Sequence, residues 1–216
     1  MSTLVWVSTF SNETILRDDF VTNVRTNIAE DEADLVSDAQ LYEIIYQGLR
    51  DINSRTGLLP EYCELTLDGS SYYDLPAGFT KMGSVYHINS SGQRKWIRNS
   101  NLSKVQEDYA SSFFDNYIRE GNRIYMYGAG ASGTIRVYGS RMPTMPTTNI
   151  YIDLPNEFLQ LLYDWCEWKY WRRRREMDES RSARQLYLAG IKEAQLQIAK
   201  DYGKGVFMYG KKSSKI

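Results

Sequence analysis

A glycine-rich loop at residues 128–133 is the part of this sequence that comes nearest to a nucleotide-binding motif. It reads GAGASG and fits the pattern GxGxxG, and Asp153 follows at about the distance of a ribose-binding acid. The motif holds a pyrophosphate only where a helix begins directly after the glycines, because the amides of that helix bind the phosphates. Here residues 134–138 read TIRVY, which is typical of a strand, and two prolines precede Asp153. We therefore interpret the loop as the tip of a β-hairpin and keep nucleotide binding as the weaker alternative.

Other residues that could catalyse a reaction or bind a metal form no recognisable set. His87 is the only histidine and lies in an expected strand without a nearby serine or cysteine nucleophile motif. Cys63 and Cys166 form neither a metal-binding nor a disulfide pattern. The acidic run at 30–34, EDEAD, lacks the central glycine and closing glutamate of a calcium loop, so we interpret it as a solvated linker. We expect no catalytic residue, no cofactor, no metal ion and no enzymatic activity.

Four consecutive arginines are the sharpest charge feature of the chain: Arg172, Arg173, Arg174 and Arg175. Successive residues spread around a helix axis, so these four cannot share one face. We favour a solvated elbow between two helices, because acids at 176, 178 and 179 offset the charge and cations suit the end of a helix. The alternative is a basic ring, facing DNA or an acidic partner, that forms when many copies assemble.

Composition places the chain among globular proteins. Its 216 residues suit one domain, or one domain with a sizeable insertion, and a net charge of −1 gives no global argument for nucleic-acid binding. Aromatic residues make up 13 %, which favours buried or partner-facing surface over disorder. The first residues, MSTLVWVSTF, lack the pattern of a signal peptide, and no segment approaches the ~20 apolar residues of a membrane helix. We expect a soluble protein of the cytoplasm or of a virion.

Helices are expected at both ends of the chain. One covers about 14–29, and a second follows the capping box of Ser37 and Gln40 and ends at Gly57. A third begins near Pro155, and a fourth runs from about 180 to 200 and folds back on the third as a hairpin. The stripe of the fourth helix is Ala183, Leu186, Tyr187, Gly190, Ile191, Ala194 and Ile198.

The apolar arc of the third helix covers about half its circumference, which is more than packing against one layer requires. We expect this helix to be covered by its own domain on one side and by a second subunit on the other. Its polar face is narrow and contains Gln160, Asp164 and Glu167. The candidate residues for an interface with a subunit or partner are Phe158, Trp165, Trp168 and Trp171.

The middle of the chain changes to the alternation of β-strands. Three hairpins are expected: 63–67 with 71–75 around Asp68-Gly69, 82–88 with 94–98, and 123–127 with 134–140. A short helix is expected at 100–109, followed by an aromatic loop through residue 117. The fold class is therefore α+β, a bundle of about four helices with a β-rich insertion of hairpins between helices. The expected boundaries are 1–59, 60–149, 150–202 and an arm at 203–216. The apolar residues of that arm, Val206, Phe207, Met208 and Tyr209, suit either docking on a partner or a frayed end.

Three stretches carry a resemblance to a known family. They are the capped helix SDAQLYEIIYQGLRDINSRTGL at 37–58, the motif YDLPAGF at 73–79, and the strand-to-helix entry IYIDLPNEF at 150–158. In this order they resemble the head-to-tail adaptor (connector) proteins of tailed bacteriophages, over roughly residues 18–205. The shared motifs contain no catalytic residue.

The resemblance implies a structural virion protein of the neck, made in the cytoplasm of the bacterial host. Such adaptors form rings, typically dodecameric, beneath the portal, where they extend the DNA channel and offer a platform to tail or nozzle proteins. The resemblance also implies transient, non-specific contact with DNA in the channel. It implies no contact with a membrane. The C-terminal arm engages the portal in several such adaptors, which assigns a portal-docking role to residues 206–209. The resemblance assigns no role to the glycine loop or to the arginine run. The alternatives are another tail or capsid-completion protein, or a nucleotide-binding enzyme that uses residues 128–133.

Overall fold

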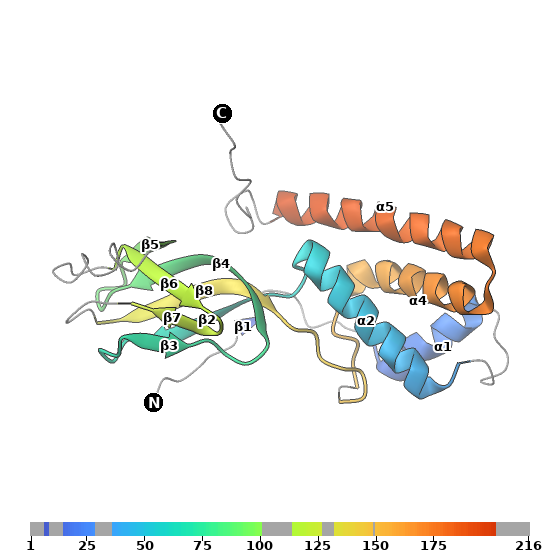
Figure 1. Cartoon of the computed structure of the whole chain (residues 1–216), viewed down its shortest axis with the longest axis horizontal. Coiled ribbons are helices and arrows are strands. Elements are labelled where there is room, and N and C mark those ends of the chain that lie inside the picture. Colours follow the sequence, from blue (N-terminus) through green and yellow to red (C-terminus); the bar gives the residue numbers. More distant parts are fainter. Residues whose placement is uncertain are drawn as a thin grey trace. The chain divides into compact units, whose positions relative to one another are not determined.

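The structure is a computed structural model in which residues 7–8, 15–28, 36–100, 114–126, 132–148 and 150–201 are described. The chain divides into two compact units. A helical unit takes residues 10–59 and 142–203, and a β unit takes residues 1–9, 60–141 and 204–216. Figure 1 shows the order of the elements along the chain.

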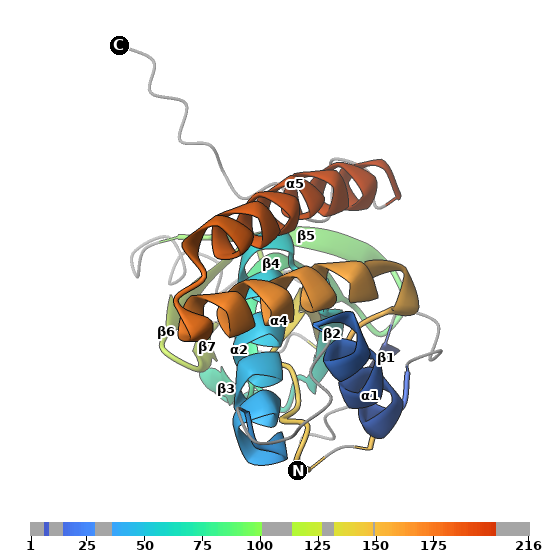
Figure 2. The same cartoon turned by 90° about the vertical axis from the view of Figure 1, so that its right-hand side faces the viewer.

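The helical unit has four α-helices among its described residues: α1 (Arg17–Asn27), α2 (Asp38–Thr56), α4 (Leu159–Arg174) and α5 (Met177–Asp201). A short 3-10 helix, η2 (Asn156–Phe158), leads into α4. Helix α4 lies against α5 on one side and against α1 and α2 on the other (Figures 1 and 2). Phe20 of α1 stacks on Tyr163 of α4 with ring centroids 4.4 Å apart. None of the described helices is long and apolar enough to span a membrane.

Helix α2 begins and ends where its sequence predicts. The Ser37 hydroxyl accepts the Gln40 backbone N–H at 3.4 Å, and the Gln40 side chain accepts the Ser37 N–H at 3.2 Å. Gly57 adopts the left-handed conformation, φ 71°, and donates its N–H to Asn53 O at 2.8 Å. The capping box and the glycine cap are therefore confirmed.

The elbow between α4 and α5 is tight, as expected. Arg175 has φ 63°, the left-handed conformation that ends a helix, and it is the only non-glycine residue with positive φ in the described part of the chain. Its N–H donates to Arg172 O at 3.3 Å. Helix α5 begins at Met177, three residues before the predicted start, and it packs on α4 as the predicted helical hairpin.

For one residue of the predicted apolar stripe of α5, the expected burial is wrong. Leu186 is 59 % exposed, because it projects from the side of α5 that faces away from α4 and α2. Tyr187 and Ile191 are buried as predicted.

The β unit is an eight-stranded sheet with the order β1-β2-β8-β4-β5-β6-β7-β3. The strands are β1 (Val7–Ser8), β2 (Pro60–Thr66), β3 (Tyr72–Asp74), β4 (Phe79–Ile88), β5 (Arg94–Asn99), β6 (Asn116–Glu120), β7 (Arg123–Tyr125) and β8 (Thr134–Arg141). The β5–β6 pair is parallel and the other pairs are antiparallel. Seven of the strands, β2 to β8, lie between α2 and α4 in sequence. The α+β class with a β-rich insertion is therefore confirmed.

Only one of the three predicted hairpins is correct. Strands β4 and β5 pair as expected, with Val85 opposite Ile97. The other two are wrong, because β2 pairs with β8 and β1, whereas β3 pairs with β7. The expected aromatic loop before residue 117 contains the start of β6, which forms a hairpin with β7. The short helix expected at 100–109 lies outside the described residues, apart from Ser100.

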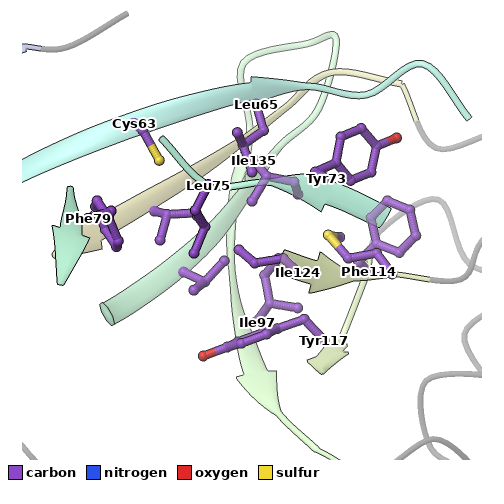
Figure 3. Close-up of a cluster of buried hydrophobic side chains, with 13 residues drawn as sticks. Cys63, Leu65, Tyr73, Leu75, Phe79, Ile97, Phe114, Tyr117, Ile124 and Ile135 are labelled. Atoms are coloured by element: carbon purple, nitrogen blue, oxygen red, sulfur yellow. The ribbon is translucent and has the colours of Figure 1, made fainter. Parts of the chain in front are cut away.

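The concave side of the sheet holds the core of the β unit. Figure 3 shows side chains from strands that are far apart in sequence meeting there, including Cys63 and Leu65 of β2, Ile97 of β5 and Ile124 of β7. These four side chains are at most 1 % exposed. The alternation of apolar residues along each strand therefore predicted which side chains face the core, although it did not predict which strands pair.

Candidate subunit and partner interfaces

The predicted interface tryptophans occupy different environments in the helical unit. Trp165 is buried, as is Phe158 at the start of the helix, and the Trp165 indole N–H donates to Ile44 O of α2 at 2.9 Å. Trp168 and Trp171 are only partly buried. The first two side chains therefore have a packing role within the chain, and the last two retain accessible ring surface.

An aromatic cluster explains most of the wide apolar arc of α4. Trp165 meets Trp168 edge-on at 5.1 Å, and Tyr187 of α5 contacts both, at 5.3 and 6.0 Å between centroids. Lys169 Nζ lies 4.2 Å from the centroid of each tryptophan ring. Because α5 and α2 both cover α4, the chain itself supplies two covering layers. A second subunit is thus not needed to bury the arc, and a contact at Trp168 and Trp171 stays a prediction.

Polar links tie the same cluster to α2. The Tyr187 hydroxyl donates to Asp51 Oδ2 at 2.5 Å, and Arg55 Nε donates to the same oxygen at 2.6 Å. Burial raises the pKa of Tyr187 first, and the bond to Asp51 raises it further. The tyrosine therefore stays protonated as the donor.

The expected polar face of α4 is partly buried. Asp164 is 8 % exposed and accepts a hydrogen bond from Gln160 Nε2 at 2.8 Å. Burial raises its pKa, and burial together with the Asp164 charge raises the pKa of Glu167. Helical spacing placed Asp164 on a solvent-exposed polar face, and this expectation is wrong. The residue is buried because α1, α2 and α5 together cover more of the circumference of α4 than a single apolar stripe.

The four arginines differ in what they contact. Arg174 bonds the Tyr170 hydroxyl at 3.0 Å and pairs with Glu176 at 3.1 Å. Arg175 is the helix cap. Arg172 and Arg173 are exposed, and the side chain of neither makes a hydrogen bond or ion pair with the residues that the structure describes. The run is therefore an elbow with two cations left open toward solvent.

The candidate nucleotide and metal sites gain no support from the geometry. Residues 128–131 of the glycine loop lie outside the described residues, but a strand, β8, follows the loop where the motif needs a helix. Asp153 accepts the Thr144 N–H at 2.7 Å, so its carboxylate is engaged within the segment that links β8 to η2. No group of three histidine, cysteine or acidic side chains is placed to hold a metal ion in the described ranges.

His87 is a structural residue of the β unit. Its Nε2–H donates to Ser132 O at 3.2 Å, and its Nδ1 accepts the Phe114 N–H at 3.4 Å. Burial, followed by the charge of Lys95, lowers its pKa, whereas the Ser132 bond opposes that shift. The imidazole is therefore held neutral with its proton on Nε2.

Sequence reasoning missed a tyrosine–arginine face on the outer side of the sheet. Tyr62, Tyr138 and Tyr86 form a row across β2, β8 and β4, with centroids 5.5 and 5.8 Å apart. Arg94 stacks on Tyr86 with its guanidinium carbon 3.6 Å from the ring centroid, and Arg136 lies 4.7 Å from that of Tyr62. The signal was present as aromatic and basic residues at alternate positions of strands whose other positions are apolar.

The same face includes the exposed end of β5. Trp96 is 53 % exposed, and the guanidinium carbon of Arg98 lies 5.4 Å from the centroid of its ring. Tyrosine, tryptophan and arginine are the residues most enriched at the energetic centres of protein interfaces. The tyrosine–arginine face therefore has the composition of a protein-binding surface.

The sequence match decides the family. A profile described as SU10 adaptor protein matches residues 17–206, from the first residue of α1 to beyond the end of α5. The chain belongs to the SU10 adaptor protein family. Comparison with curated proteins gives no significant match.

Membership of the SU10 adaptor family confirms the resemblance to phage head-to-tail adaptors. It gives the chain a structural role in the neck of a virion, as a link between virion proteins. That role needs contact surfaces, and the tyrosine–arginine face and the open part of the α4 aromatic cluster are of that kind. Residues 206–209 of the expected arm lie outside the described residues, and the family match ends at residue 206.

Proposed function

We propose that this SU10 adaptor forms a closed ring of identical copies that joins the portal to the tail and extends the DNA channel. The observation that carries the proposal is the family match over residues 17–206. A dodecamer is the expected ring size. The absence of catalytic or metal-binding geometry in the described residues is compatible with this structural role.

Neighbouring copies meet in part at the open edge of the α4 aromatic cluster. Trp168 and Trp171 keep accessible ring surface and would contact the next copy. Phe158 and Trp165 are buried and would act indirectly, by fixing the position of α4. Aromatic side chains suit this role because they bury a large area for a small loss of conformational entropy.

The C-terminal arm docks on the portal through Val206, Phe207, Met208 and Tyr209. These residues follow α5 and combine three large apolar side chains with an aromatic hydroxyl. An apolar segment of this length gains little by folding alone and more by entering a partner's groove. Deleting the residues after Gly205 is expected to leave both units folded and to weaken portal attachment. Unchanged attachment would remove this part of the proposal.

DNA in the channel makes only transient, non-specific contact with the ring. A net charge of −1 supplies no strong attraction to the phosphate backbone, which suits a conduit through which DNA must pass.

Co-expression with the cognate portal tests the proposal. Electron microscopy of the purified complex is expected to show a closed ring of this chain on the tail side of the portal. A portal that binds other neck proteins but not this chain would refute it. A ring located elsewhere in the particle would identify a different tail or capsid-completion protein.

A further inference from the structure

A basic hollow of about 450 Å³ opens at the elbow of the helical hairpin. Trp168 and Arg172 of α4 form one wall, and Met177, Ser180, Arg181 and Arg184 of α5 form the other. The Ser180 side chain is buried at its base, and Met177 is 62 % exposed at its rim. The hollow thus combines an aromatic and a thioether surface with three guanidinium groups.

The arginines of the basic hollow lack strong partners within the described residues. The Arg172 side chain makes no hydrogen bond or ion pair there, and the Arg184 guanidinium carbon lies 5.5 Å from the centroid of the Trp168 ring. Arg181 contacts Asp178 at 3.4 Å, but both side chains are largely exposed, at 70 % and 90 %. An exposed pair of this kind contributes little stability, so both groups remain available for other partners.

The charge balance at the elbow is positive despite the nearby acids, because residues 172–184 contain six arginines and three acidic residues. Asp178 and Glu179 occupy the first turn of α5, while Glu176 is engaged by Arg174. Lys169, one turn before the elbow, has its pKa lowered by burial and then by the charges of Arg172 and Arg184, with Asp51 opposing the shift. The hollow therefore favours an anionic occupant that can bring several carboxylates together.

The chain contains such a segment. Four of the five residues at 30–34 are acidic, and they form the densest group of carboxylates in the sequence. Several described carboxylates elsewhere are already paired, such as Asp38 with Arg25 and Asp74 with Arg123. A ring of identical copies is built from head-to-tail contacts in which two different patches of one chain meet. A basic hollow and an acidic segment on the same chain satisfy that requirement.

We propose that the basic hollow at the α4–α5 elbow binds the acidic segment 30–34 of the neighbouring copy. The inference rests on the proposed ring and names one of its subunit contacts. Carboxylates of the segment pair with Arg172, Arg181 and Arg184, and Trp168 and Met177 contact its backbone and apolar flank. Arg172, the one member of the arginine run that lines the hollow, thus serves assembly rather than DNA binding.

A charge swap in the full-length chain tests the contact. R172E/R181E is expected to raise the concentration needed for ring assembly about tenfold or more, because it places like charges opposite each other. D31R/E32R is expected to have the same effect, and the four substitutions together should restore assembly. R50E/R173E is the matched control, because it reverses two exposed arginines that do not line the hollow and should assemble as the parent chain does.

Assembly is measured as the fraction of chain in closed rings, by mass photometry, both alone and with the cognate portal. Circular dichroism confirms folding, and R172Q/R181Q replaces the glutamate variant if that variant does not fold. Normal assembly of the hollow variants, or a swap that does not restore assembly, overturns the inference and leaves the ring intact. If R172E/R181E assembles normally but no longer binds duplex DNA, the hollow is a DNA-binding site, and the inference is again overturned. If the parent chain forms no ring in either condition, the proposed function itself fails.

Discussion

Replacing Gly48 by alanine probes a close approach of α2 and α4. A Cβ atom at this position of α2 would lie 2.6 Å from Trp165 Cδ1 and 2.7 Å from Leu162 Cδ1. The Trp165 ring cannot move away easily, because its indole N–H is bonded to Ile44 O and its ring packs on Trp168 and Tyr187. We therefore expect G48A to force α2 and α4 apart.

The expected magnitude follows from two opposing effects. Overpacking a filled interior costs about 1–3 kcal/mol, and alanine recovers about 1 kcal/mol of helix propensity relative to glycine. Because the tryptophan is fixed, the cost falls toward its upper limit, and G48A should lower the free energy of unfolding by about 1–2 kcal/mol. Urea denaturation followed by circular dichroism at 222 nm measures this change.

Gly190 of α5 provides the matched control. A Cβ there would meet Leu161 Cδ2 at 2.5 Å, but the next atom, Leu161 Cγ, is 3.8 Å away. The end of a leucine side chain can rotate, so G190A should be neutral or stabilising by up to about 1 kcal/mol. If G48A proves as stable as G190A, the fixed packing of Trp165 against α2 is refuted.

Three further predictions concern buried polar groups. Tyr187→Phe should cost about 1–2 kcal/mol, because Asp51 loses a buried donor, and its urea midpoint should fall while that of the exposed-site variant Tyr72→Phe does not. The depressed pKa of His87 means that the folded state binds fewer protons than the unfolded state, so stability is full above about pH 6.5 and falls as the pH drops below it. Stability measured between pH 7 and about pH 5 should decline less steeply in His87→Gln, and equal slopes would contradict the assignment. Cys63 and Cys166 are buried, and burial raises the pKa of Cys63 to about 12, so neither thiol should react with a thiol reagent until the protein unfolds.

Local signals in the sequence predicted the helices well. Ser37, Gln40 and Gly57 act within a single turn of chain, so their chemistry could be interpreted without knowledge of the fold. The α4–α5 hairpin was also predictable, because a short charged elbow leaves two apolar helices little choice but to pack on each other. Leu186 was predicted to be buried but is exposed, because helical spacing indicates which face of a helix is buried and not how wide that face is.

Strand pairing and the contact surfaces were harder to predict. Asp68-Gly69 does form a turn, with Gly69 at φ 85°, yet the strands on either side pair with β8 and β7 rather than with each other. That choice depends on contacts across the whole β unit, which local turn chemistry does not encode. The tyrosine–arginine face and the basic hollow were missed for the same reason, because Tyr138 and Arg94, like Trp168 and Arg184, meet only after folding.

The most direct measurement of the central claim is an electron cryo-microscopy reconstruction of the neck in purified virions. A closed ring of this chain is expected between portal and tail, with its central opening continuous with the DNA channel and its C-terminal residues 206–209 against the portal. A density in the neck that this fold does not fit, or this chain at a different site in the particle, would contradict it.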